Sequence, residues 1–162
     1  MNEERFVKLD RMRFTKNKLS SSLALLAIVF DVLFFVSIYQ SDVGSYYYTI
    51  LIGASVLYNL IFMLMAFLAS EGVKNYKRGY SWLLLALGVG QIARIFILPK
   101  QAVEATIKIK KEVIPVMSQG QYTWVVACLV ISAVCCIASA VINLIKSRQL
   151  EQHNAALEMQ TV

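Results

Sequence analysis

Residues 122–145 read YTWVVACLVISAVCCIASAVINLI, a run that contains no Asp, Glu, Lys or Arg. An α-helix needs about 20 consecutive, predominantly apolar residues to cross the hydrocarbon core of a bilayer, so this run is long enough to do so. Three further apolar blocks, at about 20–40, 46–70 and 80–98, are separated from it and from one another by charged segments. The sequence therefore predicts four transmembrane helices.

The composition agrees with a membrane location, because 58% of the 162 residues are apolar, against roughly 45–50% in a soluble domain. A soluble fold would interleave its apolar and polar residues with a period of 2 or 3.6. A transmembrane β-barrel would show alternating segments of about ten residues. We expect an all-α integral membrane protein, with a four-helix bundle over residues 20–145, a basic segment at 1–19 and a tail at 146–162.

The basic residues predict the orientation of the bundle. The segment 1–19 carries six Lys or Arg residues, the loop 71–79 carries three and the tail begins with two, whereas the connection 41–45 has none. Cytoplasmic loops are enriched in Lys and Arg, so both termini are expected in the cytoplasm, at a plasma (inner) membrane of bacterial type. The loop 99–121 carries four lysines and falls outside. The first block is longer than the apolar core of a signal peptide and is expected to be retained.

The external loop 99–121 is too apolar for a simple tether, since hydrophobic residues alternate with its charges. Val103, Ile107 and Ile114 favour an amphipathic helix lying at the membrane interface, whereas the alternation over Thr106–Lys110 is typical of a strand. We predict a short interfacial helix that ends before Pro115, where the proline ring makes continuation costly. The loop would shield the mouth of the bundle or dock a partner.

Four polar residues inside the apolar blocks are the candidate site. Asp31 lies near the middle of the first block, and a charge at the bilayer centre costs roughly 2.5–3.5 kcal/mol on insertion scales. Arg94 lies about four residues from the centre of the third block, a distance of ~6 Å that its long side chain can cover. Asn59 and Gln91 come near the centres of their own helices. We predict that Asp31 and Arg94 interact.

Two interpretations of this polar cluster remain open. An ion pair between Asp31 and Arg94 would fix the helix register, with Asn59 and Gln91 completing its hydrogen bonds. Alternatively, Asp31 would bind a proton or a cation, as intramembrane acids do in transporters. A contact with another subunit would also use these residues.

Other chemistry has little support in the sequence. The apolar blocks offer no histidine, no paired carboxylates and no hydrolase or zinc-protease motif, so we expect neither an enzyme nor a cofactor or metal site. Cys128, Cys135 and Cys136 lie in the fourth block and are expected to pack as small residues. The basic N-terminal segment would attract anionic lipid. It accompanies no recognisable nucleic-acid-binding fold, so no nucleic-acid partner is expected.

These observations lead to two hypotheses for function. The first is a small non-catalytic membrane subunit, an accessory protein of a larger membrane assembly such as a transport system, whose partners are other membrane subunits. The alternative is a self-contained, homo-oligomeric transporter or channel that uses Asp31 as its ion or proton site.

Overall fold

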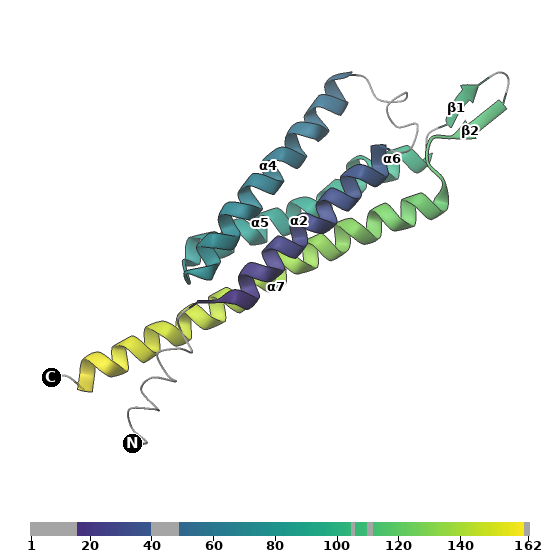
Figure 1. Cartoon of the computed structure of the whole chain (residues 1–162). Helices are drawn as coiled ribbons and strands as arrows, with labels where there is room; N and C mark the ends of the chain where they lie inside the picture. The colour runs from purple at the N-terminus through teal and green to yellow at the C-terminus, as the bar shows by residue number, and fades with distance from the viewer. Residues whose placement is uncertain (1–15, 40–48, 105, 110–111, 161–162) are drawn as a thin grey trace.

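The computed structural model describes residues 16–39, 49–104, 106–109 and 112–160 (Figure 1). Its long helices are α2 (Lys18–Tyr39), α4 (Thr49–Lys74), α5 (Arg78–Ile97) and α7 (Gln119–Gln160). Each of the four is long and apolar enough to cross a membrane. The prediction of four long apolar helices that could span a membrane is thus confirmed, and these helices indicate a multi-pass membrane protein.

The four helices pack as a ring, in which α2 and α5 each contact both α4 and α7. Figure 1 shows that α4 approaches the others near its C-terminal end and lies apart from them near its N-terminal end. Close packing of α5 on α7 depends on Gly88, because a Cβ placed there would lie 3.2 Å from the Ala133 carbonyl oxygen. On the other side of α7, the Ser132 hydroxyl donates to the Ala27 carbonyl of α2 at 2.9 Å.

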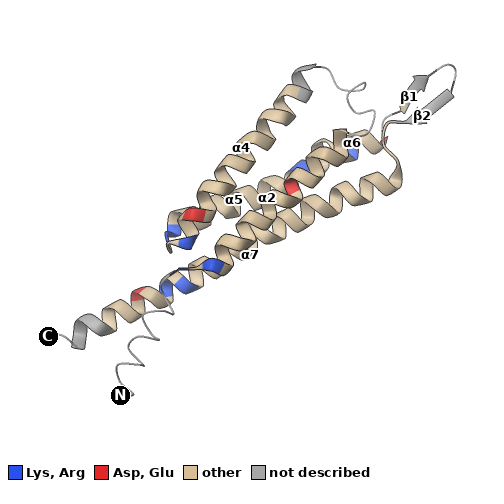
Figure 2. Ribbon diagram, in the orientation of Figure 1, with Lys and Arg blue, Asp and Glu red and all other residues tan. Residues whose placement is uncertain are grey.

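Basic residues gather at one end of the bundle, here named the basic end and marked by Lys18, Lys74, Arg78 and Lys146 (Figure 2). At this end α2 and α7 are joined by two reciprocal bonds, in which the Ser20 and Ser139 hydroxyls each donate to the other residue's carbonyl oxygen, at 2.5 and 2.6 Å. These bonds satisfy hydroxyl donors that hydrocarbon could not satisfy.

Asn17 adds a second tie at the basic end. Its backbone N–H donates to the Lys74 carbonyl at 2.9 Å, and its side-chain amide donates to Asn143 of α7 at 3.2 Å. Its Oδ1 also accepts from the Ser20 N–H at 3.4 Å, as an N-cap residue does. The start of α2 is therefore held against both α4 and α7.

The turn between α4 and α5 follows the Schellman pattern for a helix C-terminus. The N–H groups of Tyr76 and Lys77 donate to the carbonyls of Val73 and Gly72, at 3.1 Å each. Tyr76 has φ 59°, the left-handed conformation that glycine usually supplies at this position. Burial raises the pKa of the Tyr76 phenol above its ordinary value of 10.0.

The helix α7 is longer than its predicted span at 122–145, since it continues to Gln160. Its extension remains tied to α5, because Arg78 donates to the Ser147 hydroxyl at 3.3 Å and pairs with Glu151 at 2.6 Å. Ser147 is buried. The extension beyond the predicted span is thus held by polar contacts rather than by an apolar run.

The loop between α5 and α7 differs from the prediction of a helix ending before Pro115. A short helix, α6 (Pro99–Glu104), is followed by strands β1 (Thr106–Ile109) and β2 (Glu112–Pro115), which pair antiparallel with Thr106 opposite Pro115. Val103, Ile107 and Ile114 therefore lie on three separate elements, and the helix prediction is wrong over 106–109 and 112–115. The alternation and the β-branched residues favour strands here. We name this end of the bundle the hairpin end.

Candidate functional site

The structure brings all four predicted site residues together. Asp31 comes from α2, Asn59 from α4, and Gln91 and Arg94 from α5. Their exposed fractions are 0% for Asp31 and Gln91, 1% for Asn59 and 4% for Arg94. Gln91 and Arg94 are three residues apart, so one face of α5 carries both side chains. We name these four residues the polar cluster.

Asp31 accepts two hydrogen bonds on the same oxygen. Its Oδ1 accepts from Gln91 Nε2 at 2.8 Å and from Arg94 Nη1 at 3.3 Å. The ion pair therefore has a single nitrogen–oxygen contact and lacks the two-bond geometry that arginine and a carboxylate often adopt. One end of the guanidinium remains available to other partners.

Arg94 uses that remaining capacity toward α4 and toward aromatic rings. Its Nη1 donates to Asn59 Oδ1 at 2.5 Å, and its Nη2 donates to the Ser55 hydroxyl at 3.4 Å. Its Cζ lies 4.2 Å from the centre of the Phe34 ring and 4.8 Å from that of Tyr58. Cation–π contacts of this kind stabilise a charge that is largely removed from water.

Sequence reasoning did not assign Ser55, Phe34 and Tyr58 to the site. Ser55 lies one turn from Asn59, and that four-residue spacing is the signal that could have identified it. The aromatic residues gave no comparable signal, because large apolar side chains occur along every span. Their contribution depends on the contact of α2 and α4 with Arg94.

Three buried polar atoms of the cluster have no hydrogen-bond partner among the described residues. They are Asp31 Oδ2, Gln91 Oε1 and Asn59 Nδ2, two acceptors and one donor. A buried polar atom without a partner costs roughly 1–3 kcal/mol. The cluster thus has a capacity to bind that its own side chains leave unused.

Apolar side chains enclose the polar cluster on both sides along the bundle axis. Toward the basic end lies a buried group that includes Ala27, Phe62 and Cys136. Toward the hairpin end lies a second buried group that includes Ile38 and Leu129. The polar cluster is therefore one layer between two apolar layers, and Arg94 and Asp31 neutralise each other within it.

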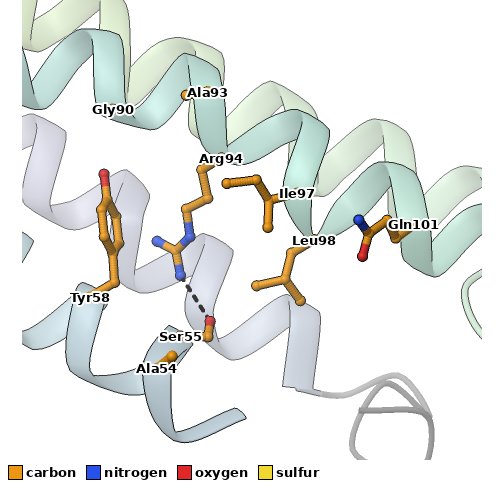
Figure 3. A pocket seen from close by; sticks show the side chains of 9 residues that line it. All are labelled: Ala54, Ser55, Tyr58, Gly90, Ala93, Arg94, Ile97, Leu98 and Gln101. Carbon is orange, nitrogen blue, oxygen red and sulfur yellow. Dashed lines mark hydrogen bonds between the residues drawn. The ribbon is translucent and has the colours of Figure 1, made fainter. Parts of the chain in front are cut away.

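A partly open pocket of about 550 Å³ lies beside Arg94, between α4 and the α5–α6 segment (Figure 3). Figure 3 shows the Arg94 side chain reaching from α5 toward Ser55, with Tyr58 to one side and Leu98 to the other. The lining residues are Ala54, Ser55, Tyr58, Gly90, Ala93, Arg94, Ile97, Leu98 and Gln101. Arg94 thus contacts both the polar cluster and the pocket.

In the part of the chain that the structure describes, no group of three or more His, Cys, Asp or Glu side chains could hold a metal ion. The three cysteines are unpaired and buried, and Cys136 belongs to the apolar layer on the basic side.

Comparison with protein-family models gives no match, and neither curated proteins nor solved structures match the chain.

Proposed function

We propose that the chain is a small, non-catalytic integral-membrane subunit, an accessory protein of a larger membrane assembly of the transport type. The observation that supports this function best is the enclosure of the polar cluster between two apolar layers. In that setting the bond of Arg94 to Asp31 links α5 to α2, and its bond to Asn59 links α5 to α4. A charge pair that connects three helices suits a fixed scaffold.

The outer surface suits a protein that meets lipid and neighbouring transmembrane helices. Large apolar side chains such as Leu64, Trp82 and Phe96 are more than half exposed on the bundle. In a bilayer, helices associate through packing and interhelical hydrogen bonds rather than through the hydrophobic effect. We propose that other membrane subunits contact these exposed helix faces.

We propose a bacterial-type plasma (inner) membrane as the location, with both termini in the cytoplasm. Figure 2 shows Lys and Arg at the end where α2 begins and α4 meets α5, which supports a cytoplasmic basic end. Residues 1–15 of the basic segment 1–19 lie outside the described residues. We propose that this segment meets anionic lipid on the same side.

Purification of the tagged full-length chain from its native membrane in a gentle detergent tests the subunit function. We expect the same membrane proteins to co-purify in a fixed ratio, and their own abundance to fall when the chain is deleted. A chain that purifies alone, with the abundance of its neighbours unchanged by deletion, contradicts the proposal.

A second candidate, a homo-oligomeric transporter or channel, is favoured by Asp31 Oδ2 and Gln91 Oε1, two buried acceptors with no hydrogen-bond partner in the described part of the chain. These two oxygens could hold a proton or a small cation. Purified chain in liposomes should then show proton or cation flux that Asp31→Asn abolishes. Glu71→Gln is the matched control, since it makes the same acid-to-amide change at an exposed residue. Equal flux in the two variants excludes Asp31 as the transport site.

A further inference from the structure

We propose that the pocket between α4 and the α5–α6 segment binds the carbonyl group of an uncharged lipophilic molecule. Two sources supply this chemistry in a membrane, namely the ester of a bilayer lipid and a quinone. The pocket volume of about 550 Å³ lies within the roughly 300–1,000 Å³ of small-molecule sites. Such sites combine apolar walls with a few converging polar groups, and this pocket has both.

Hydrogen-bond donors line the pocket, and two of them, on Arg94 and Ser55, lie close together. The bond from Arg94 Nη2 to the Ser55 hydroxyl is 3.4 Å long, beyond the usual 2.7–3.2 Å of an N–H···O bond. Ser55 accepts that bond, so its own hydroxyl hydrogen can be donated elsewhere. Ser55 is only 7% exposed, which places this donor in the interior of the bundle.

Tyr58 supplies the third donor. Its hydroxyl lies against the backbone of Gly90, because a Cβ placed on Gly90 would lie 2.7 Å from the Tyr58 oxygen. Among the described residues, no hydrogen bond of this hydroxyl is found, although it borders the pocket. A phenol facing hydrocarbon without a partner is costly, and an oxygen in the pocket would supply one.

Charge decides which acceptor fits. Asp31 already neutralises Arg94, so a carboxylate in the pocket would leave an unbalanced negative charge in apolar surroundings. An uncharged carbonyl oxygen accepts from the same donors without that cost. Its lone pairs suit two of the three donors at once.

The remaining walls fit an apolar body. Ala54 and Ala93 leave space on the two helices, and Ile97 and Leu98 continue the apolar surface toward the hairpin end. Gln101 lies beyond them and is exposed. We infer that the carbonyl sits at Arg94 and that the body of the molecule extends toward Gln101.

Binding can be measured with the delipidated full-length chain in dodecyl maltoside, as the rise of its thermal midpoint with probe concentration. The probes are dioleoyl phosphatidylcholine, its diether analogue without carbonyls, a decyl-substituted benzoquinone, and laurate. We expect a saturable rise with the diester lipid or with the quinone. The diester identifies a bilayer lipid as the source, and the quinone identifies a quinone. The diether lipid and laurate should give no saturable rise.

Two variants place the binding in the pocket. Ala93→Leu should weaken the apparent Kd at least tenfold, because the added side chain occupies the cavity. Ala86→Leu is its matched control, since Ala86 is an exposed alanine two turns away on α5 and does not line the pocket. Tyr58→Phe should weaken binding about two- to tenfold, the value of one hydrogen bond, whereas Tyr80→Phe on α5 should have no effect.

Several results would overturn the proposal. An equal rise with the diester and diether lipids, together with no effect of the quinone, would show that the carbonyl is not recognised. Saturable binding of laurate alone would show that the site takes an acid. Binding that survives Ala93→Leu, or that Ala86→Leu weakens equally, would place the ligand elsewhere.

Discussion

The stability losses caused by removing Asp31 alone and Arg94 alone should add up to much more than the loss caused by removing both. The perturbation is a double-mutant cycle on Asp31→Asn and Arg94→Gln. Asp31→Asn keeps an oxygen that Gln91 can reach but leaves the guanidinium without its counter-charge. Arg94→Gln leaves the carboxylate with Gln91 and also removes the bonds to Asn59 and Ser55.

The burial of the two side chains sets the size of the expected stability loss. Asp31 is fully buried and Arg94 is 4% exposed, and breaking a buried ion pair by removing one partner costs about 3–5 kcal/mol. The cation–π contacts with Phe34 and Tyr58 should place Asp31→Asn at the lower end of this range. The double variant still lacks the two bonds from Arg94 to α4, so it should lose about 3–4 kcal/mol, and the coupling should exceed about 2 kcal/mol.

Thermal unfolding in detergent measures the cycle. For a chain of this size, 1 kcal/mol corresponds to about 2–4 °C in the midpoint, so each single variant should lower it by roughly 6–20 °C. Glu71→Gln with Lys74→Gln is the control cycle, because that pair is close, at 2.8 Å, but exposed. Its coupling should stay below about 0.5 kcal/mol. A coupling energy between Asp31 and Arg94 that is no larger than that of the control pair would refute the reasoning.

Three further predictions concern the backbone and the orientation. Gly88→Ala should lower the free energy of unfolding by about 1–3 kcal/mol, because its Cβ would meet Ile137 and the Ala133 carbonyl. Gly53→Ala should instead raise the free energy of unfolding by about 0.5–1 kcal/mol, because its Cβ would meet nothing within 4 Å. Tyr76→Gly should be more stable than Tyr76→Ala by about 1–2 kcal/mol, since both lose the side chain but only alanine keeps the strain at φ 59°. A cysteine at Lys100 should react with an impermeant reagent in intact cells, and one at Glu151 should not.

Each of these predictions has a clear contradiction. Equal thermal midpoints for the two glycine variants would show that α5 and α7 can separate at no cost. Equal midpoints for the two Tyr76 variants would show that the turn does not need its left-handed residue. Labelling at Glu151 but not at Lys100 would invert the proposed orientation, and labelling at both would exclude the four-span topology.

The long helices were predictable because the property that specifies them is local. An uninterrupted apolar run longer than the hydrocarbon core leaves an α-helix as the simplest way to satisfy the backbone. The extension of α7 beyond 145 was not predictable on that basis, since its contacts through Ser147 and Glu151 need Arg78 of another helix. The hairpin was missed for a different reason. Over 103–114, the seven-residue spacing of Ile107 and Ile114 favours a helix, while a two-residue alternation favours a strand. The helical spacing gave the wrong prediction for this segment.

The polar cluster was predictable in its members but not in its surroundings. Burial of a charge in hydrocarbon demands a partner, and depth along each helix was enough to select Asp31, Arg94, Asn59 and Gln91. Depth says nothing of rotation about the helix axis, which decides whether an aromatic ring faces lipid or a guanidinium. That is why Phe34 was not assigned to the cluster.

The two terminal nitrogens of the Arg94 guanidinium have different partners, and this difference links the polar cluster to the pocket. Its Nη1 donates to Asp31 and Asn59 of the polar cluster, while its Nη2 borders the pocket and, among the described residues, donates only through the long bond to Ser55. A fixed cluster therefore orients the pocket donor in advance, and preorganised donors bind an acceptor at lower entropic cost. The ion pair also removes net charge from the layer, which leaves the pocket suited to an uncharged guest. The same contacts that hold three helices in register thus determine what the neighbouring pocket can accept.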